Sequence, residues 1–271
     1  MKKLLPLILS LAAFSAQSRE LPAWQQLEFE QQALWVSARS KISVAAISDG
    51  GAHPIWRLHA ESSVAGNLER VAVEFDADSG RAIYRSRFSQ GKNRRHKEYR
   101  YQSDAVTRLR REPPGADSTE APADWPITSE RKLSLPVQFE GSVVSTPWLL
   151  LLLACDALAH PYTVARFIVH TDFNYYEVTA RLTGTEELEV KNPAGTVPAA
   201  GTHLVKVVGL QIRPINPLAD KPDFMLLGLS DDISILYDSN NHLPLQLRGR
   251  APKIGRTHID LKAAVLRQTQ L

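Results

Sequence analysis

The residues best suited to chemistry by type and spacing are the Arg and Lys residues between positions 81 and 111. This stretch holds eleven of them against two acidic residues, Glu98 and Asp104, although the formal net charge of the whole chain is only +3. A local excess of this size attracts polyanions over roughly a Debye length, about 8 Å at physiological salt. The sequence therefore predicts an anion-binding face with these candidate residues: Arg81, Arg85, Arg87, Arg100, Arg108 and Arg110.

The candidate partners of this face are anionic lipid, lipopolysaccharide and acidic glycan. Nucleic acid would satisfy the same electrostatics, but we expect no nucleic-acid partner because the chain has the features of an exported protein. A plainer alternative is a solvated sheet face whose arginines protect an edge from pairing with other chains.

Side-chain alternation sets the expected direction of these arginines. Residues 90–93, QGKN, are typical of a turn, so positions 81–101 should form a hairpin. Successive side chains of a strand point to opposite faces. One face of the first strand then carries Ala82, Tyr84, Ser86 and Phe88, and the other carries Arg81, Ile83, Arg85 and Arg87. We expect the aromatic residues inside and the arginines in solvent.

Catalytic chemistry finds little support in the sequence. Cys155 lies in an apolar run, where a thiol is a structural filler. His170 and Asp172 form a His–carboxylate pair, but zinc sites need three or four convergent ligands, so we expect a surface or turn role. No G-x-S-x-G, H-E-x-x-H or Gly-rich phosphate loop is present. We predict no catalytic residue, no metal site and no cofactor, although an active site assembled from distant residues stays an alternative.

The elements that position the basic residues are mostly strands. Period-two patterns bounded by turn residues recur along the chain, beginning with the stretch 27–47. Short strands joined by polar turns imply an antiparallel meander. Residues 113–126 hold four prolines and form a loop. In the second half we expect strands at 163–172, 174–184, 202–215, 223–229, 232–238, 243–249 and 257–267.

One helix is expected, at residues 147–159. Ser145 or Thr146 can cap its first turn, and His160 with Pro161 ends it. Because this helix is apolar on every side, most of its surface must be buried, and the concave face of a curved sheet is the simplest partner. If the helix can yield, it lines a cavity for acyl chains with Trp148, Leu149 and Leu152, although core packing alone also explains these residues.

The first residues resemble a secretory signal peptide. Lys2 and Lys3 precede an apolar run that is shorter than the about 20 residues needed to span a bilayer. Small residues fit cleavage after Ser18 or Ser15. We therefore expect residues 1–18 to be a signal peptide and residues 19–271 to be one β-rich domain in the periplasm. Cys155 is the single cysteine, so stability must come from burial and not from an internal disulfide.

A family resemblance enters at the C-terminus. Residues 232–266 contain a strand that ends at Tyr237 and Asp238, a strand opened by Leu243-Pro244-Leu245, and Ile254-Gly255 before a last strand. This segment resembles the closing strands of a family of exported bacterial β-sheet proteins known as a domain of unknown function. The resemblance implies a curved antiparallel sheet similar to the half-barrels of lipoprotein carriers, and it carries over no catalytic residue.

Together these features predict a mainly β fold: a curved antiparallel sheet or incomplete β-barrel with one apolar helix packed on its concave face. The expected function is a non-enzymatic periplasmic binding or cell-envelope factor that engages a lipid-like or anionic envelope component, with peripheral membrane contact left open. The alternatives are a periplasmic hydrolase of envelope glycans or lipids and an interaction module that uses exposed strand edges. A continuous apolar cavity larger than about 300 Å³ would favour the binding factor.

Overall fold

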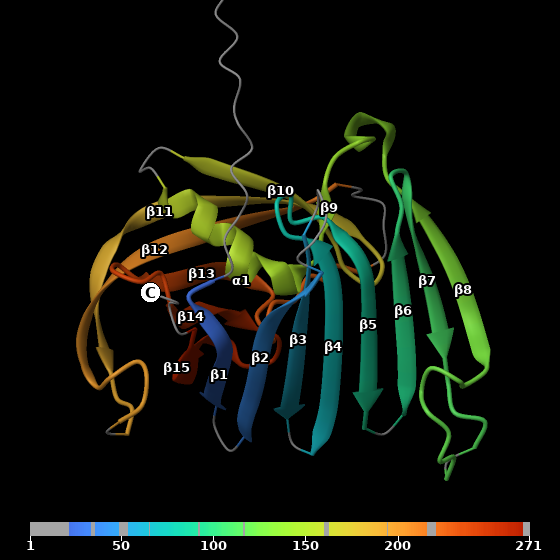
Figure 1. Cartoon of the computed structure of the whole chain (residues 1–271), viewed down its shortest axis with the longest axis horizontal. Helices are drawn as coiled ribbons and strands as arrows, with labels where there is room; N and C mark the ends of the chain where they lie inside the picture. The colour runs from blue at the N-terminus through green and yellow to red at the C-terminus, as the bar shows by residue number, and fades with distance from the viewer. Residues whose placement is uncertain are drawn as a thin grey trace, which may run out of the picture.

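The computed structural model describes residues 22–33, 36–48, 54–64, 66–91, 93–115, 117–159, 163–193, 195–215 and 221–267. The expected signal peptide, its cleavage sites after Ser15 or Ser18, and the helix stop at His160 and Pro161 lie outside these residues. The described strands form one 15-stranded sheet in the order β8-β7-β6-β5-β4-β3-β2-β1-β15-β14-β13-β12-β11-β10-β9. It is a meander whose first and last strands pair in the middle of the sheet (Figure 1).

The strand bounds show where turn residues interrupt the pattern. The strands are β1 (Trp24–Ala33), β2 (Val36–Ser48), β3 (Ile55–Val64), β4 (Asn67–Asp76), β5 (Ala82–Gln90), β6 (Arg95–Tyr101), β7 (Ala105–Arg111), β8 (Ile127–Ser134), β9 (Val144–Ser145), β10 (Val164–His170), β11 (Tyr175–Val190), β12 (Gly201–Pro214), β13 (Asp231–Asp238), β14 (Pro244–Ala251) and β15 (Gly255–Leu266). Neighbours run antiparallel except β9 and β10, which are parallel. The stretch 27–47 is thus two strands, and the expected strand at 223–229 is instead a loop with one isolated bridge between Leu226 and Leu229.

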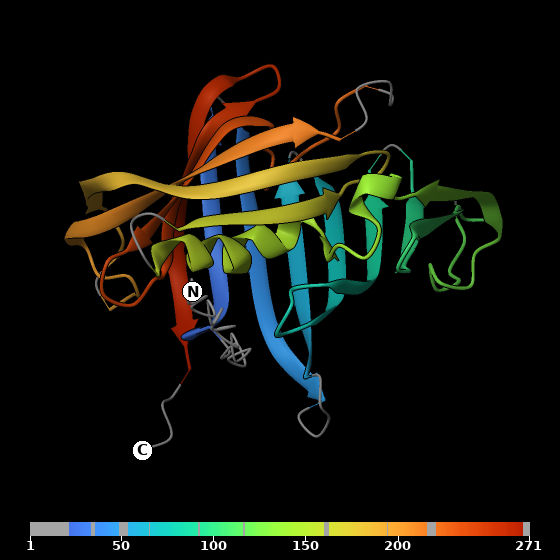
Figure 2. The same cartoon turned by 90° about the horizontal axis from the view of Figure 1, so that it is seen from above.

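The apolar helical segment packs on the concave side of the sheet, as expected. It comprises the 3-10 turn η2 (Pro147–Leu149), the α-helical turn α1 (Leu150–Leu153) and the 3-10 turn η3 (Ala154–Leu158). All five leucines from position 149 to 153 are buried in the main core. Figure 2 shows the segment beside β10 and β11, which cross over the strands of the first half of the chain.

The prediction that a side chain of Ser145 or Thr146 caps this segment is wrong. Thr146 occupies the N-cap position, but its side chain makes no capping hydrogen bond, and its carbonyl accepts the N–H of Leu149 at 3.1 Å. A bond from another strand holds the segment in place, because the Tyr237 hydroxyl donates to the Leu151 carbonyl at 3.1 Å. Tertiary packing therefore positions the helical segment, since its own end carries no side-chain signal.

A β-bulge decides the direction of the β5 side chains. Phe75 pairs with Ala82 while Glu74 pairs with Tyr84, so Ile83 is an extra residue in β5. After the bulge, Arg85 stands opposite Val73, a fully buried core residue. Arg85 and the arginine two residues later therefore face the concave side, and the expectation that these arginines point into solvent is wrong.

The aromatic residues of β5 take the outer face, where the proline-rich loop covers Phe88. Phe88 packs against Trp125, with ring centroids 6.1 Å apart, and Trp125 is fully buried. The Arg111 guanidinium ties this loop to the sheet by donating to the Trp125 carbonyl at 2.8 Å. The loop thus buries Phe88 on the outer face, although this residue was expected to lie on the inner face.

Among the described residues, no helix has the length and apolarity that crossing a membrane would take. The last three strands, β13 to β15, follow the turns expected from the C-terminal sequence. Gly255 has a φ of +85°, a conformation that favours glycine, at the start of β15.

Candidate functional site

The concave side of the sheet holds a hollow of about 740 Å³ below the helical segment. Part of its lining is apolar, from Val64, Leu68, Trp148, Met225, Leu227 and Ile254. Another part is charged, from Glu69, Arg85, Arg87, Arg95, Asp172 and Asp223. The hollow therefore presents an apolar surface and a group of ionic side chains to the same space.

Two arginines of this charged lining, Arg85 and Arg87, belong to a group of cross-strand neighbours on β5, β6 and β7. Arg85 pairs in register with Tyr99, and Arg87 pairs with Lys97. Arg108 lies opposite Tyr99 on β7. Residues directly opposite in antiparallel strands share a face, so these side chains form one basic wall. We use this name for Arg85, Arg87, Lys97 and Arg108.

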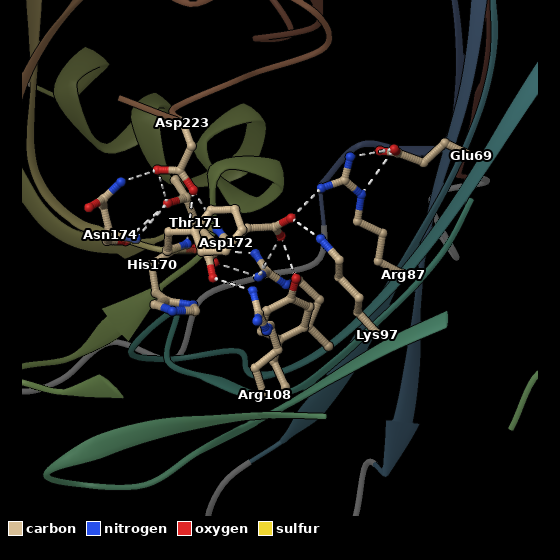
Figure 3. Close-up of polar contacts among 12 residues, drawn as sticks. Glu69, Arg87, Lys97, Arg108, His170, Thr171, Asp172, Asn174 and Asp223 are labelled. Atoms are coloured by element: carbon tan, nitrogen blue, oxygen red, sulfur yellow. Dashed lines mark hydrogen bonds and ion pairs between the residues drawn. The ribbon is translucent and has the colours of Figure 1, made fainter. Parts of the chain in front are cut away.

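Asp172 enters the basic wall from the turn between β10 and β11 (Figure 3). Its carboxylate accepts from Arg87 Nη1 at 3.0 Å, and Lys97 Nζ and the Tyr99 hydroxyl also donate to it. Arg85 Nη2 lies 3.8 Å from the same carboxylate. One side chain thus meets three cations and a phenol from the opposite arm of the sheet.

Arg85 also binds the backbone of this turn. Its two terminal nitrogens donate to the carbonyls of His170, at 3.2 Å, and Thr171, at 2.7 Å. The side chain of Arg85 is only 4% exposed. Because a buried charge is stable only when it is paired and hydrogen-bonded, these contacts account for an arginine inside the sheet.

Asp223 fixes the turn that carries Asp172. Its carboxylate accepts the backbone N–H of Asp172 at 3.0 Å and that of Phe173 at 2.9 Å. It also accepts from the Thr171 hydroxyl, the Asn174 amide and the Tyr176 hydroxyl. Hydrogen bonds to a carboxylate are the stronger kind, so Asp223 anchors the backbone of the turn through contacts that do not involve the Asp172 side chain.

The local charges keep Asp172 ionised. Burial by itself would raise the pKa of this carboxyl, but Arg87, Lys97 and Arg85 outweigh that effect and hold the pKa well below its usual range. Burial lowers the pKa of Lys97, and Asp172 opposes that shift. Burial also raises the pKa of Tyr99, so its phenol stays protonated as a donor. The wall thus surrounds an anion at neutral pH.

Cationic groups outnumber the carboxylates at this wall. Glu69 takes part of the charge of Arg87, accepting at 2.9 and 2.6 Å. Arg108 instead donates from Nη1 to the Asp172 backbone carbonyl at 3.5 Å, and its guanidinium lies 4.9 Å from the Phe173 ring centroid. Lys97 also lies over that ring, at 5.7 Å. These are cation–π distances, and they leave the wall with more positive than negative charge.

The structure brings together four of the six arginines proposed from the sequence. Arg85, Arg87, Arg108 and Arg110 share the concave face, and Arg110 also forms an ion pair with Glu112. Arg81 and Arg100 are exposed and lie apart from them: Arg100 pairs with Tyr84 on the outer face. The prediction of a single basic face formed by all six arginines is therefore wrong.

The proposed apolar lining is also divided. Trp148 lines the hollow, but Leu149 and Leu152 belong to the main core. His170 and Asp172 lie at the β10–β11 turn, yet neither is at the surface: His170 is 1% exposed and the Asp172 side chain 13%. Lys97, Tyr99 and Asp223 were missed. The alternation of β6 could have indicated Lys97 and Tyr99, whereas no local pattern marks Asp223.

The arrangement suits anion binding better than acid–base chemistry. A general acid or base works best with a pKa near the working pH, and Asp172 is far below it. The His203–Asp238 pair, 3.0 Å apart, uses the second imidazole nitrogen on the Ala199 carbonyl at 2.9 Å. Within the part of the chain that the structure describes, no three His, Cys, Asp or Glu side chains gather in a way that could hold a metal.

Comparison with known proteins gives a fold. No family model matches the sequence, and no curated protein matches it. The crystal structure of a beta-barrel-like protein of domain of unknown function DUF1849 from Brucella abortus aligns with 93% of this chain and 100% of its own, with a TM-score of 0.51 and 8% identity. The two chains share a fold. The expected likeness to a β-sheet family of unknown function is thus confirmed for the architecture.

Proposed function

We propose that this protein binds an amphiphile, with an apolar part in the hollow and an anionic group at the basic wall. The observation that carries this proposal is the hollow of about 740 Å³ whose lining combines apolar side chains with Arg85 and Arg87. Ligand sites are mostly apolar clefts of about 300–1,000 Å³ with a few polar groups that fix orientation. The hollow has this size and this composition.

The rim of the hollow supports the same function. Val64, Met225 and Ile254 all line the hollow, and each keeps more than 40% of its surface exposed. Exposed apolar groups gathered at one opening are typical of an interaction site. They give an apolar chain a path between a lipid layer and the hollow.

The natural partner in this proposal is an envelope component of an exported protein. Anionic lipid, the lipid part of lipopolysaccharide, or another acidic amphiphile fits both halves of the site, whereas a purely polar acidic glycan would leave the apolar lining unused. Contact with a membrane would be peripheral and salt-dependent, because exposed charges are screened over a Debye length. No catalytic step is part of this function.

A steric block of the hollow tests the proposal. Ser62 lines the hollow, and the neighbouring Ser63 is exposed and points to the other face of β3. Ser62→Trp should weaken binding of a fluorescent fatty acid by about tenfold or more, because indole fills space that the chain needs. Ser63→Trp is the matched control and should bind as the wild type does.

Equal affinities in the wild type and both tryptophan variants would contradict a ligand inside the hollow. Mass spectrometry of lipids that co-purify with the protein from its native envelope fraction then identifies the natural ligand. An extract that holds no amphiphile above the level seen for Ser62→Trp would count against the proposal as well.

A further inference from the structure

We infer that the basic wall is a phosphate-binding subsite and that Asp172 occupies it as an internal counter-anion, which the anionic group of the ligand replaces. This deepens the proposed function and rests on it for the rest of the ligand, because it names the chemistry of the head and the residues that receive it. The ligand class is an amphiphile with a phosphate head. No covalent step is involved: one anion exchanges for another at the same donors.

The hollow gives direct access to part of the basic wall. Arg85, Arg87, Asp172 and Phe173 all line the hollow. An anion in the hollow can therefore reach the guanidinium groups of Arg85 and Arg87 without crossing the sheet. The Asp172 carboxylate already pairs with both of these groups, so it is the group that an entering anion must displace.

The basic wall carries more positive charge than its carboxylates neutralise. Arg85, Arg87 and Lys97 all lie within 4 Å of the Asp172 carboxylate, while Arg108 donates to the Asp172 backbone carbonyl and lies over the Phe173 ring. Glu69 neutralises part of the charge of Arg87. The four cationic groups of the wall thus face two carboxylates, those of Asp172 and Glu69. A phosphate carries up to two charges and would match the wall more closely.

Several buried hydrogen-bond donors at and beside the basic wall have no partner among the described residues. Among the described residues, the Nε groups of Arg85 and Arg108 and the hydroxyl of Tyr101 are buried without a hydrogen-bond partner. Buried donors without partners are rare in proteins and need an explanation. A carboxylate has two oxygens, and both oxygens of Asp172 already accept hydrogen bonds, from Arg87, Lys97 and Tyr99. A phosphate head brings three or four acceptor oxygens.

The turn between β10 and β11 has an anchor other than the Asp172 side chain. Asp223 holds the backbone of residues 172 and 173 through two N–H groups. The turn therefore keeps its shape when the Asp172 carboxylate is displaced or neutralised. A structural ion pair that only held the two arms together would not need this second anchor.

Exchange with inorganic phosphate tests the subsite without the apolar part of the ligand. Asp172→Asn removes the internal anion but keeps the size of the side chain, so the variant should melt at a lower temperature in chloride. Phosphate at the same ionic strength should restore the melting temperature saturably, with an affinity about tenfold or more above that of the wild type. In the wild type, phosphate must compete with Asp172.

Asp104→Asn is the matched control. The Asp104 carboxylate lies in the turn between β6 and β7, is 60% exposed and contacts Lys132 at 3.5 Å. This substitution therefore changes the net charge equally without touching the wall. It should respond to phosphate as the wild type does. An equal response of Asp104→Asn and Asp172→Asn, or no recovery of Asp172→Asn, would overturn the inference.

A second variant covers the case in which Asp172→Asn does not fold. Arg108→Gln leaves the Asp172 ion pairs in place, because Arg108 contacts only the backbone of that residue. It should weaken binding of dodecyl phosphate by about tenfold, whereas Arg100→Gln on the outer face should not. Unchanged affinity in Arg108→Gln would refute the subsite.

The two sets of experiments fail separately. If Ser62→Trp blocks a fatty acid while phosphate has no specific effect on Asp172→Asn, the hollow binds apolar chains and the subsite is wrong. If phosphate rescues Asp172→Asn while Ser62→Trp changes nothing, the subsite stands and the proposed use of the hollow is wrong.

Discussion

His170 shows what burial does to one titratable side chain. Its ring lies among the aromatic rings of Tyr99, Tyr101 and Tyr175, with centroids 5.8, 5.8 and 5.1 Å away. Burial, and then the nearby Arg85, lower the pKa of His170 well below its ordinary value. The imidazole is therefore neutral in the folded protein over the pH range in which the unfolded chain takes up a proton.

The pH dependence of stability follows from this shift. Below the unfolded pKa of 6.5 the unfolded state binds a proton that the folded state does not, so the free energy of unfolding falls as the pH drops, by up to about 1.4 kcal/mol per pH unit. His170→Gln should remove this contribution. Urea unfolding between pH 5 and 7.5 measures it, because the ionised carboxylates such as Asp172 lose their contribution only below about pH 5.

His258→Gln serves as the control for this series. The side chain of His258 is 61% exposed, so its removal should leave the wild-type slope unchanged. The idea fails if the slope of stability against pH is the same in His170→Gln and the wild type.

The turn between β4 and β5 packs directly against the helical segment. Gly80 has a φ of +73°, and a Cβ at this position would lie 2.6 Å from Leu153 Cδ2 in α1. The turn itself is set by Asp76, whose side chain accepts the N–H of Ser79 at 2.8 Å. The absence of a side chain at position 80 is therefore needed both for the turn and for the approach of the helical segment.

A pair of glycine substitutions separates these two requirements. Gly66 has a φ of +79° and no atom within 4 Å of an added Cβ. Gly66→Ala should cost about 1 kcal/mol for backbone strain alone. Gly80→Ala should cost about 1–3 kcal/mol more because it overpacks the core. Chemical denaturation measures both, and equal losses would show that the contact with Leu153 adjusts freely.

For the whole molecule, the sheet has a well-packed centre and a thinner arm. The main core joins β1–β4 and β10–β15 with the helical segment, whereas the arm of β6–β8 packs on a smaller second cluster that includes Tyr99, Val106 and Tyr175. Most β8 residues are exposed on both faces. Resistance to local opening follows buried apolar contact, so the two parts should differ in protection.

Hydrogen exchange tests this difference. Amides of β8 that pair with β7 should exchange at least about tenfold faster than those of β3, which lie between two strands over the main core. Tyr175 links the arm to the rest of the fold by donating to the Leu133 carbonyl at 2.9 Å, so Tyr175→Phe should widen the gap. Equal protection of β3 and β8 would show that the sheet opens as one unit.

Local patterns in the sequence determined the class of the fold. The alternation of buried Val71, Val73 and Phe75 with less buried neighbours is a property of adjacent residues. So are the turns between strands and the apolar run without a polar face. They depend on the geometry of one strand or one helix. The mainly β fold, the curved sheet and the buried helical segment could therefore be predicted, and so could the concentration of positive charge at residues 81–111.

Tertiary structure alone decided where that charge points and what it contacts. The extra residue Ile83 shifts the register of β5, and a shift by one residue moves later side chains to the other face. Arg87 then meets Asp172, which is 85 positions away in the sequence, and Asp172 is held by Asp223, 51 positions further on. A buried arginine is stable only beside its partner, and no local pattern encodes a partner that the curvature of the sheet brings across the hollow.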